Sequence, residues 1–357
     1  MTFYQKITYL ILLFTLSIGS VSATDASTIK DKHEKMNVKE FILEHVSDAY
    51  EWHITTIGEK EISIPLPVIV HSSNGWHIFL SSEFRHTASY EGLSIAKEGK
   101  YKGKIVEISS TGEEIRPFDI SITKVTLSLI ISSILLIIII MSVANSYKKG
   151  VYESKKGFVG FMEMFVMNIN DDVIKPCVGP QYKKYAPYLL TLFFFIFINN
   201  LLGLIPIFPG GANVTGNIAI TFVLATVTLL IINIGGSKEY WKEILWPDVP
   251  LWLKAPIPLL PIIEIVGIFS KAFALMIRLF ANMLAGHSIG LGLTCLVFVT
   301  VSMGPAMNTS MTVVSVIFSV FIAFVELLVA YIQAYIFTML TAVFIGLARV
   351  EPHNKPQ

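Results

Sequence analysis

The sequence predicts an all-α integral membrane protein with a small extracytoplasmic α+β domain near its N-terminus. Of its 357 residues, 53% are hydrophobic and only 15% are charged, and the mean hydropathy is +0.64. Soluble domains carry about 25% charged residues, so a large soluble core is excluded. We expect four parts: residues 1–23 as a signal peptide, 24–122 as the extracytoplasmic domain, 123–350 as the membrane domain and 351–357 as a cytoplasmic tail.

The first segment is typical of a secretory signal peptide. Lys6 supplies the charged region, residues 9–18 form a short apolar run, and Val21-Ser-Ala23 is a small-residue cleavage site. An uncleaved anchor is the alternative, but the apolar run is short for a hydrocarbon core of about 30 Å. We therefore expect the mature chain to begin outside the cytoplasm.

Residues 24–122 are mostly polar and are expected to form the extracytoplasmic domain. Residues 38–52 have helical spacing, whereas residues 76–81 and 104–109 alternate as strands do. Six of the eight histidines lie here: His33, His45, His53, His71, His77 and His86. None of them forms the i, i+4 pair of a helical metal site, so we predict no metal centre. Cys177 and Cys295, the two cysteines, likewise have no zinc or disulfide spacing.

The membrane domain is expected to begin with a span over residues 125–146. Four lysines follow this run, at positions 148, 149, 155 and 156. Positive charge marks the cytoplasmic side, so this helix is predicted to run from outside to inside, in agreement with the signal peptide. Residues 158–169 are apolar but short and follow these lysines closely, which favours an amphipathic helix lying along the cytoplasmic surface.

Four further spans are predicted, and the last two are unusually long. Residues 187–208 and 218–234 form a helical hairpin, whereas 257–302 and 309–347 each remain apolar for about 40 residues. At 1.5 Å per residue such a helix measures about 60 Å, twice the hydrocarbon thickness. Each segment is either two broken helices or one steeply tilted helix. Gly304-Pro305 separates them, and we favour a long, strongly tilted hairpin as the end of a five-helix membrane domain.

Arg278 is the most informative residue, because it lies inside the first of these long apolar segments. A guanidinium at bilayer depth costs about 2.5–3.5 kcal/mol on insertion scales, and it cannot escape that cost by losing its proton. A permanent charge at this depth therefore indicates a function. A salt bridge that only joins two helices is the structural alternative.

Other polar residues accompany Arg278 at helical spacing. Glu264, Lys271 and Arg278 are seven residues apart and form one stripe, with Ser270 beside it and Asn282 one turn further on. Glu326 and Gln333 in the last segment are also seven apart. A fixed cation repels any ion that passes it, so these residues favour two polar half-paths separated by Arg278. An ion then passes the arginine only on a moving carboxylate that a partner subunit supplies.

These residues closely resemble subunit a of the F-type ATP synthase. The resemblance covers about residues 125–350 and depends on three motifs: Arg278-Leu-Phe-Ala-Asn282-Met-Leu-Ala-Gly286, Asn200-Leu-Leu-Gly203-Leu-Ile-Pro206 and Gln333-Ala-Tyr-Ile-Phe. It implies that Arg278 is the essential stator arginine that faces the ring carboxylate. It further implies an inlet half-channel of Asn282, His287, Glu326 and Gln333, and an exit half-channel of Glu264, Ser270 and Lys271.

Two departures from the family pattern affect the inlet. Some members have an acid and a histidine where this chain has His287 and Glu326, an exchange that keeps the acid–histidine pair. Some members also have an aspartate where this chain has Gly203. Asn200 and Asn213, or the neighbouring Asn199, are the candidates to replace that polar group.

The function implied by the resemblance is proton translocation coupled to ATP synthesis, in a bacterial inner membrane with the C-terminus in the cytoplasm. The partners implied are the c-ring, the peripheral-stalk b subunits and the lipid bilayer. The chain lacks a G-x-x-x-x-G-K-[ST] loop, so we expect no bound nucleotide and no catalytic site of its own. We expect no cofactor, no metal and no nucleic-acid partner either. A secondary ion-coupled transporter is the alternative function, although no internal repeat of the kind such transporters often carry is visible.

Overall fold

The computed structural model describes residues 38–57, 60–87, 89–96, 98–108, 113–148, 155–205, 208, 210–246 and 259–349. The predicted signal peptide and the tail at 351–357 lie outside the described residues. The chain divides into two units, residues 1–41 and 42–357, and the elements that position the candidate site all belong to the second.

The part of the second unit that precedes residue 123 contains three small antiparallel sheets, and we call it the β domain. β1 (Glu51–Ile57) pairs with β2 (Lys60–Pro65). The second sheet has the order β4-β3-β8, from β3 (Pro67–Ser72), β4 (Gly75–Leu80) and β8 (Phe118–Asp119). The third has the order β5-β6-β7, from β5 (Leu93–Ile95), β6 (Ile105–Ile108) and β7 (Glu114–Ile115). A short helix, α3 (Glu83–His86), follows β4.

The helix predicted over residues 38–52 is too long. Helix α2 spans only Val38–Val46, and the chain from Glu51 onward is strand β1. The segment Ile54-Thr-Thr-Ile57 explains the difference, because β-branched side chains favour strands. The strands β4 and β6 do fall where the alternating pattern predicts them.

A compact apolar core holds the β domain together. Val68 and Val70 of β3 are fully buried against Leu93 and Ile105 of the third sheet. Tyr50 is buried in the same cluster, and its hydroxyl donates a hydrogen bond to the Asp119 carboxylate. Burial, together with that carboxylate, raises the pKa of Tyr50 above its ordinary value, so the phenol remains protonated and keeps its role as donor.

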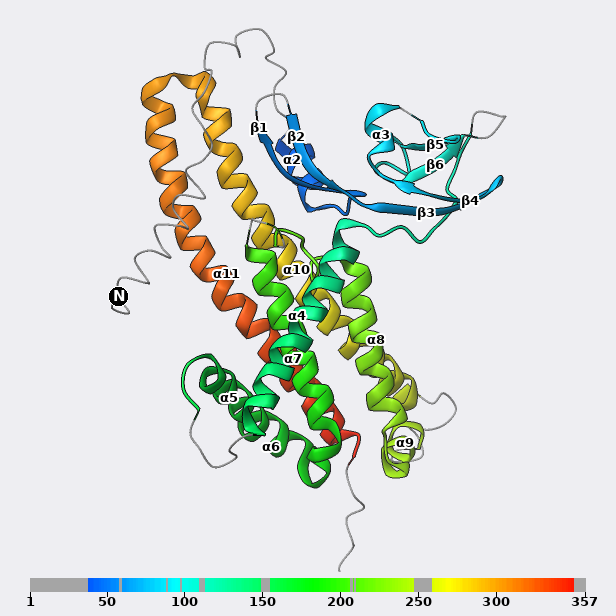
Figure 1. The fold of residues 1–357 in the computed structure, drawn as a ribbon. Helices are drawn as coiled ribbons and strands as arrows, with labels where there is room; N and C mark the ends of the chain where they lie inside the picture. The colour runs from blue at the N-terminus through cyan, green and yellow to red at the C-terminus, as the bar shows by residue number, and fades with distance from the viewer. Residues whose placement is uncertain are drawn as a thin grey trace, which may run out of the picture. The chain divides into compact units, whose positions relative to one another are not determined.

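Helices make up the rest of the second unit (Figure 1). They are α4 (Lys124–Tyr147), α5 (Phe158–Asn168), α6 (Lys175–Val178), α7 (Tyr182–Leu204), α8 (Ile218–Ile234), α9 (Lys238–Leu245), α10 (Leu259–Thr300) and α11 (Pro305–Leu347). A π-helical segment, Ile169–Ile174, joins α5 to α6, and a 3₁₀ turn, Gly179–Gln181, joins α6 to α7.

By length and apolar character, four helical stretches of the described chain could cross a membrane, or five if α8 and α9, bent by 101°, count as one span. The start predicted at Pro187 is wrong, because Pro187 lies inside α7, five residues after its beginning. A proline near the start of a helix removes a single backbone hydrogen bond, which the tightly packed α7 tolerates.

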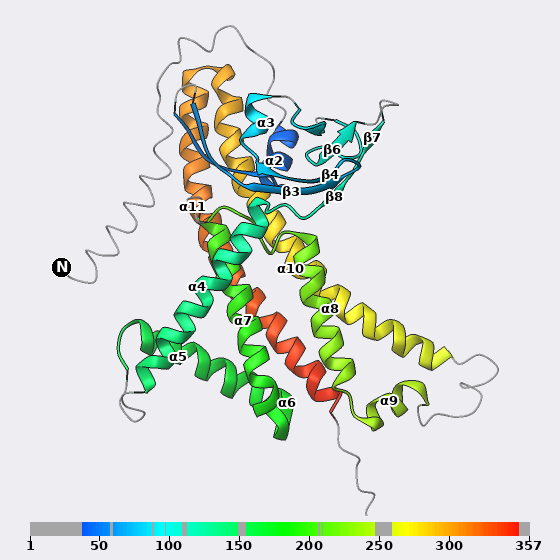
Figure 2. The ribbon, with the colours of Figure 1, turned by 45° about the vertical axis from the view of Figure 1, so that its right-hand side comes forward.

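The final two helices are long and unbroken. α10 has 42 residues and α11 has 43, so each is about 63 Å long at 1.5 Å per residue. A 3₁₀ turn, Val301–Met303, and Gly304 join them. The φ of 105° at Gly304 favours glycine at that position. The two helices pack side by side, as Figures 1 and 2 show. The alternative of two broken helices in each segment is therefore excluded.

The helical core forms where α7 meets α11 and α10 meets α8. Phe193 and Ile196 of α7, Leu279 of α10 and Ile345 of α11 are at most 1% exposed. Tyr331 of α11 packs edge-on against Phe193, with ring centroids 6.1 Å apart. These contacts fix the face that α10 and α11 present to the interior, and hence the face that they leave outside.

Candidate functional site

Arg278 lies on the outer face of α10. The helix is anchored by Leu275, Leu279 and Met283, which are all buried, whereas Arg278 is exposed. The rest of the predicted stripe is exposed as well: Glu264, Ser270, Lys271 and Asn282. Among the described residues, Arg278 has no hydrogen-bond or ion-pair partner. The salt-bridge alternative therefore has no support within the described part of the chain.

Two predicted inlet residues, His287 of α10 and Glu326 of α11, both lie close to Gly286. A Cβ added at Gly286 would overlap Glu326 Oε1 and lie 3.2 Å from its Cδ. The Glu326 carboxyl group therefore rests on the backbone of α10, one residue from His287. Close approach of this kind needs a residue without a side chain, which is what Gly286 provides.

α7 adds a third wall to this cluster. A Cβ added at Gly203 would lie 3.4 Å from Nε2 of His287 and 3.9 Å from the backbone oxygen of Ala212. The Nε2 atom is buried and has no hydrogen-bond partner among the described groups. Buried polar atoms usually bind a protein group or an ordered water, so this atom marks a place for water or for a proton donor.

The two asparagines expected near the inlet have different surroundings. Asn200 is fully buried: its Oδ1 accepts a hydrogen bond from Thr215 at 2.7 Å, and its Nδ2 donates to the backbone oxygen of Ala330 at 3.2 Å. It therefore links α7 to α11 and to the segment before α8. Asn213 accepts a bond from the Gly216 N–H at 2.8 Å, but its Nδ2 is buried without a partner in the described chain. Asn213 thus keeps a free donor, and Asn200 does not.

Gln333 is buried, whereas Arg278 is exposed. The Gln333 side chain is only 4% exposed and, like Ala334 and Phe337, belongs to the buried face of α11. No hydrogen bond between Gln333 and Arg278 is found in the described residues. The family resemblance implies a place for Gln333 close to the arginine, and this remains a prediction.

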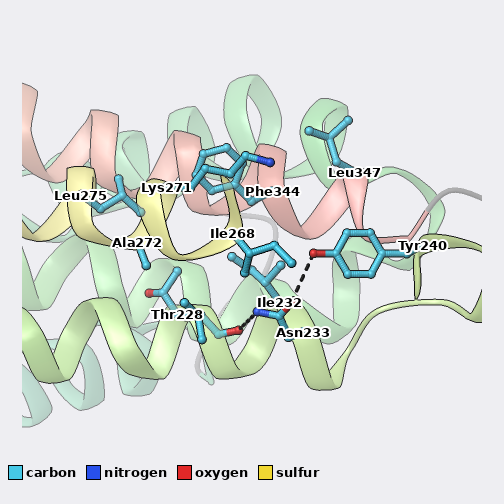
Figure 3. A pocket seen from close by; sticks show the side chains of 11 residues that line it. Thr228, Ile232, Asn233, Tyr240, Ile268, Lys271, Ala272, Leu275, Phe344 and Leu347 are labelled. Carbon is cyan, nitrogen blue, oxygen red and sulfur yellow. Dashed lines mark hydrogen bonds between the residues drawn. The ribbon is translucent and has the colours of Figure 1, made fainter. Parts of the chain in front are cut away.

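A separate cavity, lined mostly by apolar side chains, lies beside Lys271 (Figure 3). Its polar lining comes from Thr228 and Asn233 of α8, Tyr240 of α9 and Lys271 of α10. The Tyr240 hydroxyl donates to Asn233 Oδ1 at 3.2 Å, and the Lys271 ammonium lies 5.5 Å from the centre of the Phe344 ring. The cavity offers about 40 Å³ to the centres of water-sized molecules. Since one water needs about 10–15 Å³ of such volume, the cavity has room for a few.

The comparisons with known proteins agree with this architecture. Residues 126–346 match the family model of the ATP synthase A chain. The chain belongs to this family. Proteins named ATP synthase subunit a from Chlorobium phaeobacteroides (strain DSM 266) and, as subunit a 2, from Chlorobaculum tepidum are 44% and 43% identical over 238 and 245 residues. The first alignment covers 65% of this chain and 66% of the relative, and the second covers 66% and 65%.

A relative from Myxococcus xanthus, also named ATP synthase subunit a, is 33% identical over 308 residues, which is 82% of this chain and 90% of that protein. Residues 41–122 match a different model, a domain of unknown function named DUF8433. This member of the ATP synthase A chain family therefore combines the family's membrane helices with a separate domain whose role the match does not indicate.

Within the family's membrane helices, reasoning from sequence missed Thr228, Asn233 and Tyr240. Asn233 carried a usable signal, because it is an amide in an otherwise apolar predicted span. Thr228 carried a weaker signal, because threonines are common in apolar helices. In the described chain, its hydroxyl forms a hydrogen bond with the hydroxyl of Tyr188 at 3.0 Å. Of the three predicted exit residues, the structure places Lys271 in the cavity, whereas Glu264 and Ser270 are exposed and do not line it.

Proposed function

We propose that this chain is the stator subunit that conducts protons through the membrane sector of an ATP synthase. Protons reach the carboxylates of a rotating c-ring by one half-channel and leave by another, and Arg278 separates the two. The observation that carries the proposal is the exposure of Arg278 on α10 without a partner in the described chain. A permanent cation at membrane depth needs a counter-charge, so a second subunit supplies it.

The positions of the two polar sites support separate half-channels. Asn213 and Thr215 precede α8, whereas Asn233 lies near its other end, and the 17 residues of α8 span about 26 Å. Along α10, Lys271 is seven residues and His287 nine residues from Arg278, or about 10 Å and about 14 Å. Arg278 therefore stands between the two sites along α10, which supports its role as the separator of two half-channels.

In the inlet half-channel, His287 and Glu326 form the proton relay. Glu326 reaches α10 at Gly286, the residue before His287, and the unpartnered Nε2 of His287 lies beside Gly203 of α7, which supports a relay between the two groups. Histidine exchanges protons near neutral pH, and we propose that a water bound at the unpartnered amide of Asn213 extends the path. Asn282, exposed on α10, and the buried Gln333 complete the inlet. In the exit half-channel, the cavity at Lys271 holds the water through which protons leave, with Glu264 and Ser270 beyond it.

The chain acts in a bacterial inner membrane, with the c-ring and the peripheral-stalk b subunits as partners. The β domain lies outside the cytoplasm and the C-terminus inside, because the lysines at the end of α4 mark the cytoplasmic side. The pair α10–α11 lies steeply tilted, since each helix of about 63 Å is twice as long as the hydrocarbon core is thick. The chain supplies no catalytic site for ATP.

Arg278→Ala in the assembled ATP synthase tests the proposal. Membrane vesicles that carry the variant are expected to lose ATP-driven proton pumping and proton-driven ATP synthesis, while the complex still assembles. Arg116→Ala, which removes an exposed arginine from the β domain, is the matched control and is expected to retain both activities. Full coupled synthesis by the Arg278 variant would refute the proposal. Proton uptake by vesicles that contain this chain alone, driven by a co-transported solute, would favour a secondary transporter instead.

A further inference from the structure

The sheet β4-β3-β8 has one face buried in the β domain. Val68 and Val70 of β3 point into the core, where they contact Tyr50, Leu93 and Ile105. Figure 1 shows α3, β5 and β6 on one side of the β3–β4 pair, and Figure 2 shows α3 and β6 on that same side. The remaining face of the sheet therefore has no element of the β domain packed over it in the described chain.

That remaining face is strongly apolar. On β4, every second residue points outward and is large: Trp76 is 57% exposed, Ile78 73% and Leu80 50%. The register places Ile69 opposite Ile78, and β8 adds Phe118, which is 64% exposed and pairs with His71. We call this the apolar sheet face, made by Ile69, Trp76, Ile78, Leu80, Phe118 and, just beyond β8, Ile120.

Such a face is unusual for a sheet that meets water. The solvent side of an antiparallel sheet normally alternates to polar residues, and a contiguous apolar patch marks an interaction surface. Among the described residues that point outward from β3, β4 and β8, His71 is the titratable one, and the Glu107 carboxylate lines a pocket at the edge of the face beside His71 and Phe118. The Trp76 ring packs edge-on against His71, with centroids 4.9 Å apart, and still leaves more than half of its surface uncovered. Indole rings with one apolar and one polar edge favour the membrane–water interface.

We propose that the apolar sheet face rests on the lipid bilayer that α4 enters, so that the β domain is a membrane-surface module and not a freely solvated one. The chain leaves β8 at Asp119 and begins α4 at Lys124, which at about 3.4 Å per extended residue is at most about 17 Å away. This short connection keeps the sheet close to the point where the helix enters the apolar phase.

Hydrogen bonds fix that connection. The Ile122 N–H donates to the backbone oxygen of Pro67 at 3.1 Å, and Pro67 is the register partner of Leu80. The Lys124 N–H donates to Ala49 at 2.8 Å, and the Val125 N–H donates to the Asp48 carboxylate at 3.1 Å. The first residues of α4 are thus bound to the β domain, and the apolar sheet face begins beside them.

The exposed surface of α4 continues this apolar character. Ile130, Ile134, Ile137 and Ile138 are between 42% and 61% exposed. An apolar surface on a membrane helix that is followed, beyond Lys124, by an apolar sheet face suits acyl chains and the lower headgroup region. This inference does not depend on the proposed proton path, because none of its residues belongs to either half-channel.

A spin label at Ile78 tests the inference in the full-length chain. Cys177→Ala and Cys295→Ala remove the native thiols, Ile78→Cys carries the label, and the protein is reconstituted alone in phosphatidylcholine–phosphatidylglycerol vesicles. Dissolved oxygen concentrates in lipid, whereas a water-soluble nickel chelate is excluded from it. The ratio of oxygen to nickel collisions is expected to be several-fold higher at Ile78 than at Lys100→Cys, an exposed control in the turn between β5 and β6.

Phe118→Cys repeats the measurement on another strand of the same face, so the result does not depend on one variant. Equal nickel access at Ile78, Phe118 and Lys100 would show a solvated face and overturn the proposal. Exclusion of both reagents from Ile78 and Phe118 would also overturn it, because the face would then be covered by a second copy of the chain and not by lipid.

Discussion

A single methyl group added at Gly286 should lower proton conduction while the complex still assembles. In the structure, a Cβ at this position would overlap Glu326 Oε1 and lie 3.2 Å and 3.3 Å from Cδ and Cγ. Carbon atoms prefer separations of about 3.5–4.0 Å, so Gly286→Ala forces the Glu326 side chain away from α10. The three nearest heavy atoms all belong to that one side chain, which can rotate away.

The expected magnitudes differ for stability and for function. Overpacking costs about 1–3 kcal/mol, whereas replacing glycine by alanine inside a helix returns about 1 kcal/mol. The net loss of stability is therefore about 0–2 kcal/mol, which a helical core of this size tolerates. The added methyl group, however, excludes the Glu326 carboxyl group from its native position against α10. If returning to that position costs about 1–3 kcal/mol, the population of the native Glu326 conformer falls by roughly 5- to 150-fold. Proton flux through the proposed inlet is then expected to fall by a similar factor.

A double-mutant cycle provides the assay. ATP-driven proton pumping is measured in vesicles for Gly286→Ala, for Glu326→Ala and for the two changes together, with assembly of the complex as the control. Because the added Cβ acts only through Glu326, Gly286→Ala should lower pumping in the native background and have almost no further effect when Glu326 is already alanine. Additive losses would refute the reasoning, since they would show that Gly286 serves some other contact.

Three further changes test other parts of the site. Gly346→Ala should lower the unfolding temperature and the yield of assembled complex, because its Cβ would overlap a backbone carbonyl of α6 that cannot rotate away; a variant as stable as the native protein would contradict the packing. Asn200→Leu should cost about 1–3 kcal/mol, measured by thermal unfolding in detergent, because the Thr215 hydroxyl loses its buried acceptor, and adding Thr215→Val should recover part of the loss. Asn233→Leu should lower passive proton flux several-fold with assembly unchanged, whereas Ile234→Leu, at an 81% exposed neighbour, should leave flux unaltered.

Hydropathy and residue spacing predict the membrane helices well because both are properties of the local sequence and do not depend on how distant segments pack. Residues 218–234 and the C-terminal limit at Leu347 were predicted at their observed positions. The seven-residue spacing alone predicted that Glu264, Lys271 and Arg278 share one face of α10, and all three are exposed. The helix over 38–52 failed because helical spacing and alternation overlap in short segments, and β-branched residues after Glu51 favoured the strand.

What the sequence could not predict depends on how two helices approach each other. The contact between Gly286 and Glu326 joins residues 40 positions apart, and nothing in either segment indicates their distance. The cavity at Lys271 is similar, because Tyr240 of α9 meets Asn233 of α8 there only through the 101° bend between the two helices. The difference between Asn200 and Asn213 is also invisible in the sequence, since it depends on which amide finds a partner.

Gly203 and Gly286 meet different parts of the candidate inlet. Some members of the family have an aspartate at the position of Gly203, and here a side chain at that position would point at Nε2 of His287 from α7. Glu326 of α11 reaches α10 at Gly286, the residue before His287. The two glycines are therefore not equivalent, because a larger residue at Gly203 would meet the imidazole, whereas a larger residue at Gly286 would meet the Glu326 carboxyl group. The relay that we propose therefore depends on the group that occupies the place next to the unpartnered Nε2 atom, which suits a water or a proton donor.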